Sequence, residues 1–336
     1  MPYPPPLTGG SSSEGVVVVR GVVVVGTNYK LTQEEETSAR GRPKHMLTSI
    51  DDAVAARLSW SRNLSVALEA FYDRPGITDY NRAARHDPQL KHDHGRYEML
   101  GPVGPRCRSL ESFGGDAADS YRACGMHTQH APCTVVSLGS MDKWDFETSI
   151  YHHTACHVHT FDCTISNRTL PPARIRPRVT FHHACVAARN FRSKGPVYNS
   201  KGPVSTGKTA VRTFHTWPGL LMRAKITGTG SAAGGSRGPT LLKIDVEGFE
   251  WEALIAMVQS SKLLPDQIAM ELHYGTSLAE LPWYGRFKSA GEIALWMDAM
   301  WRHGRYLLVD YRRGACPHCA ELLLATETAL RQGGLA

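Results

Sequence analysis

Residues 241–254 constrain the fold more than any other part of this chain. They read LLKIDVEGFEWEAL, in which a short apolar run meets two carboxylates and a glycine before apolar residues recur at helical spacing. An apolar run that is too short for a helix predicts a buried parallel strand. Gly248 lets the chain turn, and the residues after it predict a helix packed on the sheet. We therefore expect Asp245 and Glu247 at the carboxyl end of a strand.

Two roles are open for these carboxylates. In open α/β sheets ligands bind beyond the carboxyl ends of the strands, which makes Asp245 and Glu247 candidate site residues. Acidic side chains at the start of a helix also cap its N–H groups and interact favourably with its dipole. The segment by itself supports capping and ligand binding equally, so both interpretations stay open.

Length and composition exclude several classes of protein. A chain of 336 residues with 42% hydrophobic content can bury a full-sized core. Its 38 Lys and Arg residues outnumber its 31 Asp and Glu residues, but they form no dense basic tract, so we expect no nucleic-acid partner. No apolar stretch approaches the roughly 20 residues that cross a bilayer. Residues 16–25 are rich in valine but do not fit a signal peptide, because Arg20 lies inside the apolar run.

The cysteines and two glycosylation sequences give information about the cellular compartment of the protein. Eight cysteines in a chain of this length do not predict a disulfide framework by their number alone. Cys107 and Cys124 bracket a glycine-rich turn and are candidates for a pair. Asn63 and Asn167 each begin an Asn-X-Ser/Thr sequence. These features hint at a secretory route, whereas the compartment and the oligomeric state stay unknown at this point.

Composition divides the chain into three parts. Residues 1–45 are rich in Pro, Gly, Ser and Glu and carry a valine repeat, which predicts a disordered, low-complexity tail. Residues 46–125 are expected to form an N-terminal helical extension, because apolar residues recur at helical spacing up to about residue 80. Residues 126–330 are expected to form the main domain.

A second strand, turn and helix are expected at residues 133–150. The β-branched run in this segment ends at Gly139, and the residues that follow can start a helix. A glycine at such a turn lets a ligand approach the backbone, and a helix N-terminus favours polar or anionic groups. Ser137, Gly139 and Ser140 are therefore candidate cofactor-binding residues.

Asp162 lies at the end of the next predicted strand, residues 156–163. It follows Gly139 at close to the spacing of about 20 residues that is typical of the acidic residue in dinucleotide-binding sheets. A carboxylate at this place can accept two hydrogen bonds from the hydroxyls of a ribose. A lone Asp after a strand is more often a turn residue, but its position after the glycine turn favours ribose binding.

Strands and helices alternate through the rest of the chain. We expect strands at residues 178–186, 267–273, 306–311 and 320–325, and a helix at residues 291–303. Alternation of this kind predicts a doubly wound α/β sheet with an N-terminal helical cap.

Residues 202–209 fit the P-loop pattern G-x-x-x-x-G-K-[ST] at every fixed position. In a P-loop, Lys208 would hold phosphate oxygens and Thr209 would bind magnesium. However, a P-loop follows a buried strand, and the preceding segment here is polar and contains a proline. A P-loop nucleotide phosphohydrolase or kinase is therefore kept as an alternative only.

Neither a metal site nor a serine-hydrolase site is predicted. The candidate ligands include Cys156, Cys163 and the pair Cys316 and Cys319, but none forms two clusters at zinc-finger spacing, and no H-E-x-x-H is present. The chain also lacks the G-x-S-x-G elbow of serine hydrolases.

Several of these segments resemble one enzyme family. LLKIDVEGFEWE resembles the acidic motif of FkbM-type S-adenosylmethionine-dependent methyltransferases. VSLGS at residues 136–140, VHTFDC at residues 158–163 and CPHCAELLL at residues 316–324 are similar to the eukaryotic methyltransferase-like branch. The segments keep the order of that family from about residue 107 to residue 325.

The resemblance implies a Rossmann-like methyltransferase fold with seven strands, the last of them antiparallel, and S-adenosyl-L-methionine as cofactor. Gly139 and its neighbours would face the methionine part of the cofactor, and Asp162 would hold its ribose. Asp245 and Glu247 would line the reaction pocket.

Related enzymes often methylate hydroxyls of sugars or small molecules, so an O-methyltransferase with a glycan or small-molecule acceptor is expected. Such a reaction aligns donor and acceptor and removes a proton from the hydroxyl. Asp245, Glu247 and His273 lie at adjacent predicted strand ends and are the candidate catalytic residues. The remaining alternative is an inactive binding module that keeps the methyltransferase fold.

Overall fold

The computed structural model describes residues 47–73, 96–115, 120–129, 132–199, 202–203, 209–226, 238–261, 263–275, 281, 288–313 and 319–332. All of them belong to one compact unit, residues 41–336. The predicted tail at residues 1–45 lies outside the described residues. Within them, no helix is both long enough and apolar enough to cross a bilayer.

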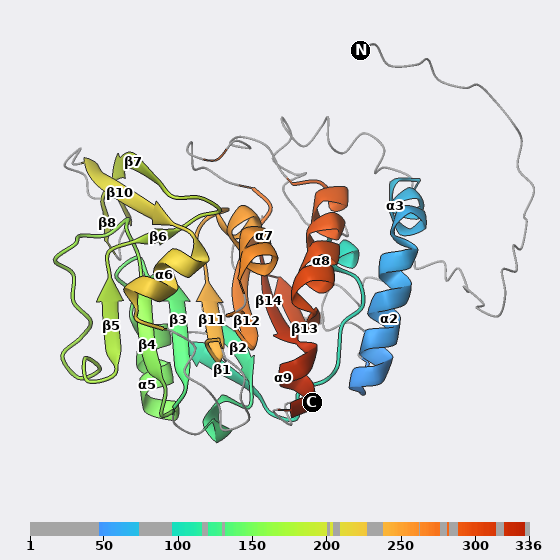
Figure 1. The fold of residues 1–336 in the computed structure, drawn as a ribbon, viewed down its shortest axis with the longest axis horizontal. Coiled ribbons are helices and arrows are strands. Elements are labelled where there is room, and N and C mark those ends of the chain that lie inside the picture. Colours follow the sequence, from blue (N-terminus) through green and yellow to red (C-terminus); the bar gives the residue numbers. More distant parts are fainter. Residues whose placement is uncertain are drawn as a thin grey trace, which may run out of the picture. The chain divides into compact units, whose positions relative to one another are not determined.

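A mixed, mostly parallel β-sheet of seven strands forms the centre of the unit (Figure 1). Its strand order is β13-β14-β12-β11-β3-β4-β5. The strands from β5 to β12 are parallel, whereas β14 is antiparallel to both of its neighbours. In chain order the strands are β3 (Thr134–Leu138), β4 (His157–Phe161), β5 (Val179–His182), β11 (Leu241–Ile244), β12 (Gln267–His273), β13 (Tyr306–Arg313) and β14 (Cys319–Thr326).

Apolar side chains cover both faces of the sheet, as the unbroken apolar runs predict. On one face α6 (Trp217–Arg223), α7 (Glu250–Ser260) and α8 (Ala290–Gly304) pack on Leu242, Ile244 and their neighbours. On the other face α5 (Asp145–His153) and a hairpin pack on Leu241 and its neighbours. The helix predicted at residues 291–303 corresponds to α8, whose start is closed by a capping box between Ser289 and Glu292.

The described residues of the N-terminal extension form helices first and a β-hairpin later. There α2 (Ile50–Arg62) and α3 (Leu64–Tyr72) precede the short 3₁₀ helix η2 (Arg96–Leu100). Beyond the helical spacing, which the sequence shows up to about residue 80, β1 (Leu110–Gly114) and β2 (Ser120–Cys124) form an antiparallel hairpin within the extension predicted at residues 46–125. Tertiary contacts explain the difference, because the Gln267 side chain of β12 pairs with the backbone N–H and C=O of Cys124.

The strand predicted at residues 178–186 is divided. Its first half is β5, and its second half, β6 (Cys185–Val186), belongs to a separate sheet with β7 (Phe191–Pro196) and β10 (Thr209–His215). The turn between the halves redirects the chain away from the main sheet. The remaining elements are β8 (Tyr198–Asn199), β9 (Gly202–Pro203), η3 (Met126–Thr128) and α9 (Glu327–Gln332).

Disulfides join several of these elements. The candidate pair Cys107 and Cys124 is bonded, and two more bonds join Cys133 to Cys156 and Cys163 to Cys185. Every described cysteine is in a disulfide, so the chain has a disulfide framework that its cysteine count alone does not predict. The count alone could not reveal these bonds, because both additional pairs depend on how the strands lie in the sheet.

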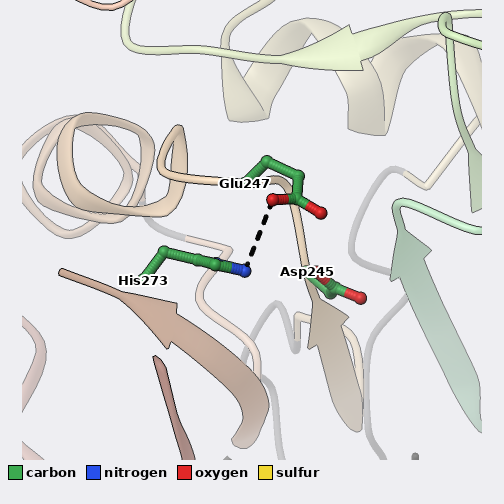
Figure 2. Close-up of side chains that lie close together, drawn as sticks. All are labelled: Asp245, Glu247 and His273. Atoms are coloured by element: carbon green, nitrogen blue, oxygen red, sulfur yellow. Dashed lines mark ion pairs between the residues drawn. The ribbon is translucent and has the colours of Figure 1, made fainter. Parts of the chain in front are cut away.

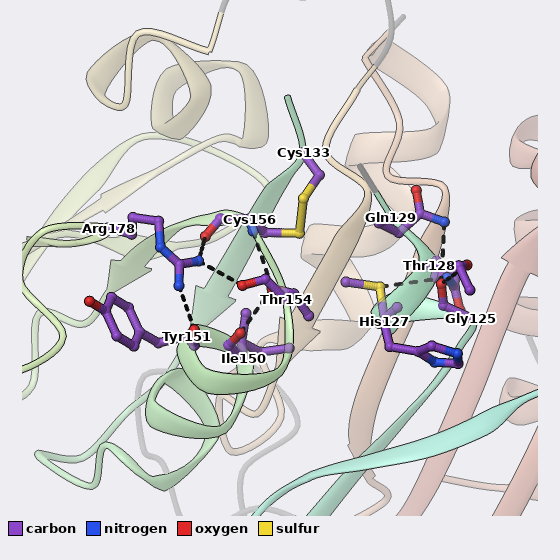
Figure 3. The surroundings of a disulfide bond; sticks show 12 residues. Gly125, His127, Thr128, Gln129, Cys133, Ile150, Tyr151, Thr154, Cys156 and Arg178 are labelled. Carbon is purple, nitrogen blue, oxygen red and sulfur yellow. Dashed lines mark hydrogen bonds between the residues drawn. A yellow bond between two sulfur atoms is a disulfide. The ribbon is translucent and has the colours of Figure 1, made fainter. Parts of the chain in front are cut away.

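A disulfide bond and hydrogen bonds from Arg178 fix the residues directly before β4 (Figure 3). The Cys133–Cys156 bond joins the residues directly before β3 and β4. Beside it, the Arg178 guanidinium donates to the carbonyl oxygens of Thr154, at 2.8 Å, and Cys156, at 2.9 Å, and also to that of Tyr151. These bonds satisfy carbonyl groups at the end of α5 and so fix the direction in which β4 begins.

Candidate functional site

Four strands present their carboxyl ends side by side. Leu138 of β3 is in register with Phe161 of β4 and with Ile244 of β11, and Ile244 is in register with Met270 of β12. The next residue of each strand therefore lies at one edge of the sheet, which we call the rim. The rim residues are Gly139, Asp162 and Asp245, each directly after its strand, and Glu271, which lies two residues before the end of β12.

The rim also contains the point where the strand order reverses. From β3 the chain continues to β4 and β5 on one side, and it returns to β11 and β12 on the other. Ligands of open α/β sheets bind at such a switch point, beyond the carboxyl ends of the strands. Gly139 and Asp245 flank this point.

Gly139 is required by the backbone beside it. Its φ is +80°, and a Cβ at this position would lie 1.8 Å from the Asp245 carbonyl oxygen. The glycine therefore lets the ends of β3 and β11 approach closely. Ser140, the next residue, is buried, and its hydroxyl has no hydrogen-bond partner among the described residues. By contrast, Ser137 is fully buried on β3 beside Glu147 and does not reach the rim.

Asp162 lies where the sequence predicts it, but its carboxylate is occupied. Oδ2 accepts hydrogen bonds from the backbone N–H groups of Ser140, at 3.0 Å, and Met141, at 2.8 Å. Oδ1 accepts from the Thr164 N–H, at 2.7 Å, and from its hydroxyl, at 2.6 Å. A carboxylate has about four acceptor positions, so a ribose would have to replace two of these bonds. The role that the contacts support is to hold the Gly139 turn.

Asp245 is held between a hydroxyl and an ammonium group. Tyr121 of the hairpin donates its hydroxyl to Asp245 Oδ2 at 2.9 Å, and Lys243 Nζ lies 3.7 Å from the same oxygen. Burial alone would raise the pKa of Asp245, but the charges of Lys243 and His273 and the Tyr121 hydroxyl together lower it. Asp245 is therefore ionised at neutral pH.

His273 is brought to Asp245 and Glu247, as Figure 2 shows. It is buried at the end of β12, and its Nδ1 lies 3.1 Å from Oε1 of Glu250, which is itself fully buried. Its Nε2 lies 3.7 Å from Glu247 Oε2 and 3.5 Å from Glu271 Oε2. The three predicted catalytic residues thus form one cluster.

The charge state of His273 does not support its predicted role as a base. Burial would lower the pKa of His273, but the carboxylates of Glu250, Glu271 and Asp245 raise it to about 10. The imidazole is then protonated at neutral pH and can only donate. In this state it positions the carboxylates around it.

Glu271 is a candidate base that the sequence interpretation missed. Burial and the charge of Asp245 raise the pKa of Glu271 to about 7. A general base works best when its pKa lies near the operating pH. One signal was present in the sequence, because Glu271 precedes His273 by two positions on a predicted strand and therefore lies on the same face.

Glu247 is the most solvent-exposed of the three clustered side chains. Its side chain is 59% exposed, whereas that of His273 is 4% exposed. Its φ of +57° is unusual for a residue with a Cβ and aims the carboxylate back toward β12. Ligand atoms of Asp245, Glu247 and His273 all lie within 4.8 Å of one another, so these three side chains could hold a metal ion.

The other sequence motifs do not converge on this site. Cys156 and Cys163 are in disulfides and cannot be zinc ligands. Lys208 of the P-loop pattern lies outside the described residues. Thr209 begins the strand β10, whereas the corresponding residue of a P-loop lies at the start of a helix.

Comparison with known proteins adds little. The chain matches no family model and no curated protein. Among solved structures it is similar to one titled "Putative hemolysin from Streptococcus thermophilus", with a TM-score of 0.31 and 11% sequence identity. The similarity covers 57% of this chain and 58% of that one.

Proposed function

We propose that this protein is an S-adenosylmethionine-dependent methyltransferase that acts on a hydroxyl of a sugar or small molecule. The observation that carries the proposal is the rim, where Gly139, Asp162 and Asp245 meet at the switch point of the sheet. The resemblance of the rim-forming segments to the FkbM-type family supplies the reaction class.

The strand arrangement supports this proposal. The resemblance implies seven strands with the last one antiparallel, and β14, the last strand of the chain, is antiparallel between β12 and β13. The strand order reverses beside β3, next to the predicted cofactor turn, and ligands of open α/β sheets bind at such a point.

Several residues near the Gly139 turn suit a cofactor that carries positive charge. The buried Ser140 hydroxyl is available for a hydrogen bond, and the carboxylates of Asp245 and Glu247 favour a sulfonium and an ammonium group nearby. Asp162 fits as the residue that shapes the turn. The ribose therefore has to bind elsewhere or displace contacts of Asp162.

Bound S-adenosylmethionine supplies a methyl group on a sulfonium sulfur. The chain's own contribution is to place the acceptor hydroxyl beside the methyl carbon and to take up the hydroxyl proton. Glu271 is the proposed base, and it receives that proton on a carboxylate oxygen. Lys243, whose ammonium donates to the Gly139 carbonyl oxygen, keeps the turn and the acidic cluster in fixed relation.

Calorimetry on the full chain tests the proposal. S-adenosylmethionine and S-adenosylhomocysteine should each bind at one site per chain, and ATP with magnesium should not. Binding of ATP with magnesium alone would favour the P-loop alternative, and binding of neither would favour a module without activity. A screen of sugars and small-molecule alcohols with radiolabelled methyl donor then identifies the acceptor.

A further inference from the structure

The strongest unassigned feature is the geometry of Asp245, Glu247 and His273. Asp245 and Glu247 follow β11, and His273 ends β12; Figure 2 shows the His273 ring facing the Glu247 carboxylate, with Asp245 beside them. All three ligand atoms lie within 4.8 Å of one another, and His273 Nε2 is 3.7 Å from Glu247 Oε2. Ligands bound at about 2.0–2.2 Å from one ion are separated by about 3–4 Å, so shifts of under about an ångström would complete the set.

A buried carboxylate fixes the orientation of the imidazole. Glu250 Oε1 accepts from the His273 backbone N–H at 2.7 Å and lies 3.1 Å from Nδ1. Its other oxygen accepts from the Gly248 N–H at 2.8 Å, which ties the turn that carries Glu247 to the same carboxylate. Metal-binding histidines commonly donate their second ring N–H to a carboxylate in this way. Nε2 is thereby aimed at the Asp245 and Glu247 carboxylates.

The local charge also favours a cation. Asp245, Glu247 and Glu271 surround His273 Nε2, and Lys243 Nζ lies 3.7 Å from Asp245 Oδ2. The exposed side chain of Glu247 leaves an approach from solvent, whereas the other members are largely buried. A cation could therefore enter and retain open coordination positions.

We infer that Asp245, Glu247 and His273 form a binding site for a divalent first-row transition-metal ion. Two carboxylates and one imidazole suit Mn²⁺, Fe²⁺, Co²⁺ or Zn²⁺ better than Mg²⁺ or Ca²⁺, which prefer oxygen ligands throughout. On binding, the ion takes the place of the proton on Nε2, which is released to solvent.

The catalytic use of the ion rests on the proposed methyl transfer, whereas its binding does not. The ion would coordinate the oxygen of the acceptor hydroxyl and make its proton more acidic. That proton would pass to Glu271, and the oxygen would form a bond to the methyl carbon as the carbon–sulfur bond breaks. The bonding pair remains on sulfur.

Titration of the chelator-treated full chain with MnCl₂, followed by electron paramagnetic resonance, tests the site. One Mn²⁺ should bind per chain, and its spin-echo modulation should show coupling to one imidazole nitrogen. Asp245→Asn, Glu247→Gln and His273→Gln should each weaken Mn²⁺ binding by at least about 10-fold, and Glu250→Gln, which loses the orienting carboxylate, by about 10–100-fold.

Two variants serve as matched controls. Glu252→Gln changes an exposed carboxylate on the same helix as Glu250, and His159→Gln changes a histidine whose Nδ1 lies 3.1 Å from His182 Nε2, away from the cluster. Both should bind Mn²⁺ like the wild type. Circular dichroism verifies the fold of every variant, and the nitrogen coupling in the wild type tests the site even where a variant does not fold.

Absence of saturable Mn²⁺ binding, absence of nitrogen coupling, or equal loss of binding in the control variants would overturn the metal site. Titration with S-adenosylmethionine in excess chelator separates the two proposals. If the methyl donor binds and chelator leaves methyl transfer unchanged, the ion has no catalytic role while the proposed function stands. If Mn²⁺ binds at the cluster and the methyl donor does not bind, the metal site stands and the proposed function fails.

Discussion

Gly139 and Asp245 are so close that a Cβ on residue 139 would lie 1.8 Å from the Asp245 carbonyl oxygen. The contact joins the cofactor turn predicted after β3 to the acidic motif predicted after β11. Because the two segments meet through backbone atoms, neither can shift without moving the other. The position of the acidic cluster thus depends on one glycine about a hundred residues away along the chain.

Replacement of Gly139 by Ala should lower the free energy of unfolding by more than about 2 kcal/mol. The added methyl group meets backbone that cannot rotate away, and the positive φ is strained for alanine. Urea denaturation measures the effect. Gly219→Ala is the matched control, since a Cβ there has its nearest neighbour at 3.4 Å within a helix, and it should be neutral or slightly stabilising. Equal effects of the two substitutions would refute the argument.

Asp162→Asn should destabilise the ligand-free protein by about 1–3 kcal/mol. The carboxylate accepts four hydrogen bonds from Ser140, Met141 and Thr164, and an amide NH₂ would face donors in place of one of its oxygens. Urea denaturation without ligand distinguishes the two roles of this residue. If it served only to hold a ribose, stability without ligand would be unchanged and only the affinity for S-adenosylmethionine would fall.

Local sequence patterns predicted most of the main sheet. The apolar runs at residues 241–246 and 267–273 correspond to β11 and β12, since each is buried on both faces and needs no distant information. The hairpin at β1 and β2 was missed because its pairing is stabilised by contacts with β12 far along the chain. Periodicity cannot show such contacts.

The sequence predicted the positions of the candidate site residues but not the interactions between them. Asp162, Asp245, Glu247 and His273 were found because strand ends are visible in the sequence. Their charge states depend on neighbours from other elements, such as Tyr121 and Glu250, and so could not be predicted. The two unpredicted disulfides escaped notice for the same reason, since only the strand order brings their cysteines together.

Glu271→Gln should lower kcat for methyl transfer by about 10²–10⁴-fold, because the base that takes the hydroxyl proton is removed. The affinity for S-adenosylmethionine should change little, since the amide keeps the size of the side chain. Radiolabelled methyl transfer to the acceptor from the screen measures kcat, and calorimetry measures affinity. Glu252→Gln is the control and should retain full activity. Retention of wild-type kcat in Glu271→Gln would exclude this residue as the base.

Loss of the Cys133–Cys156 bond should lower the free energy of unfolding by about 3 kcal/mol, the chain-entropy value for a loop of its size. The bond closes a loop with a sequence separation of 23 and joins the starts of β3 and β4. The double variant Cys133→Ser, Cys156→Ser should therefore melt at a lower temperature than the oxidised wild type. Wild-type protein in excess reductant should lose more than the double variant, since further disulfides then open. An unchanged melting temperature in the double variant would show that the bond does not stabilise the sheet.

Glu321 should make stability depend on pH. It is in register with Glu271 on the neighbouring strand, and burial and the Glu271 charge raise the pKa of Glu321 to about 8, against the lowering effect of Arg312. Since its ordinary pKa is 4.5, the folded state holds this proton more tightly than the unfolded state. The stabilising contribution is complete below about pH 4.5 and is lost as pH rises through about 8.

The variant Glu321→Gln removes this titration while keeping the shape of the side chain. The difference in free energy of unfolding between variant and wild type should therefore move in the variant's favour as pH rises from about 5 to about 9. Urea denaturation at several pH values, with chelator present so that no bound ion alters the charges, measures this difference. Glu252→Gln, at an exposed position, should show a difference that does not vary with pH. A pH-independent difference for Glu321→Gln as well would mean that Glu321 is ionised in the folded protein across this range.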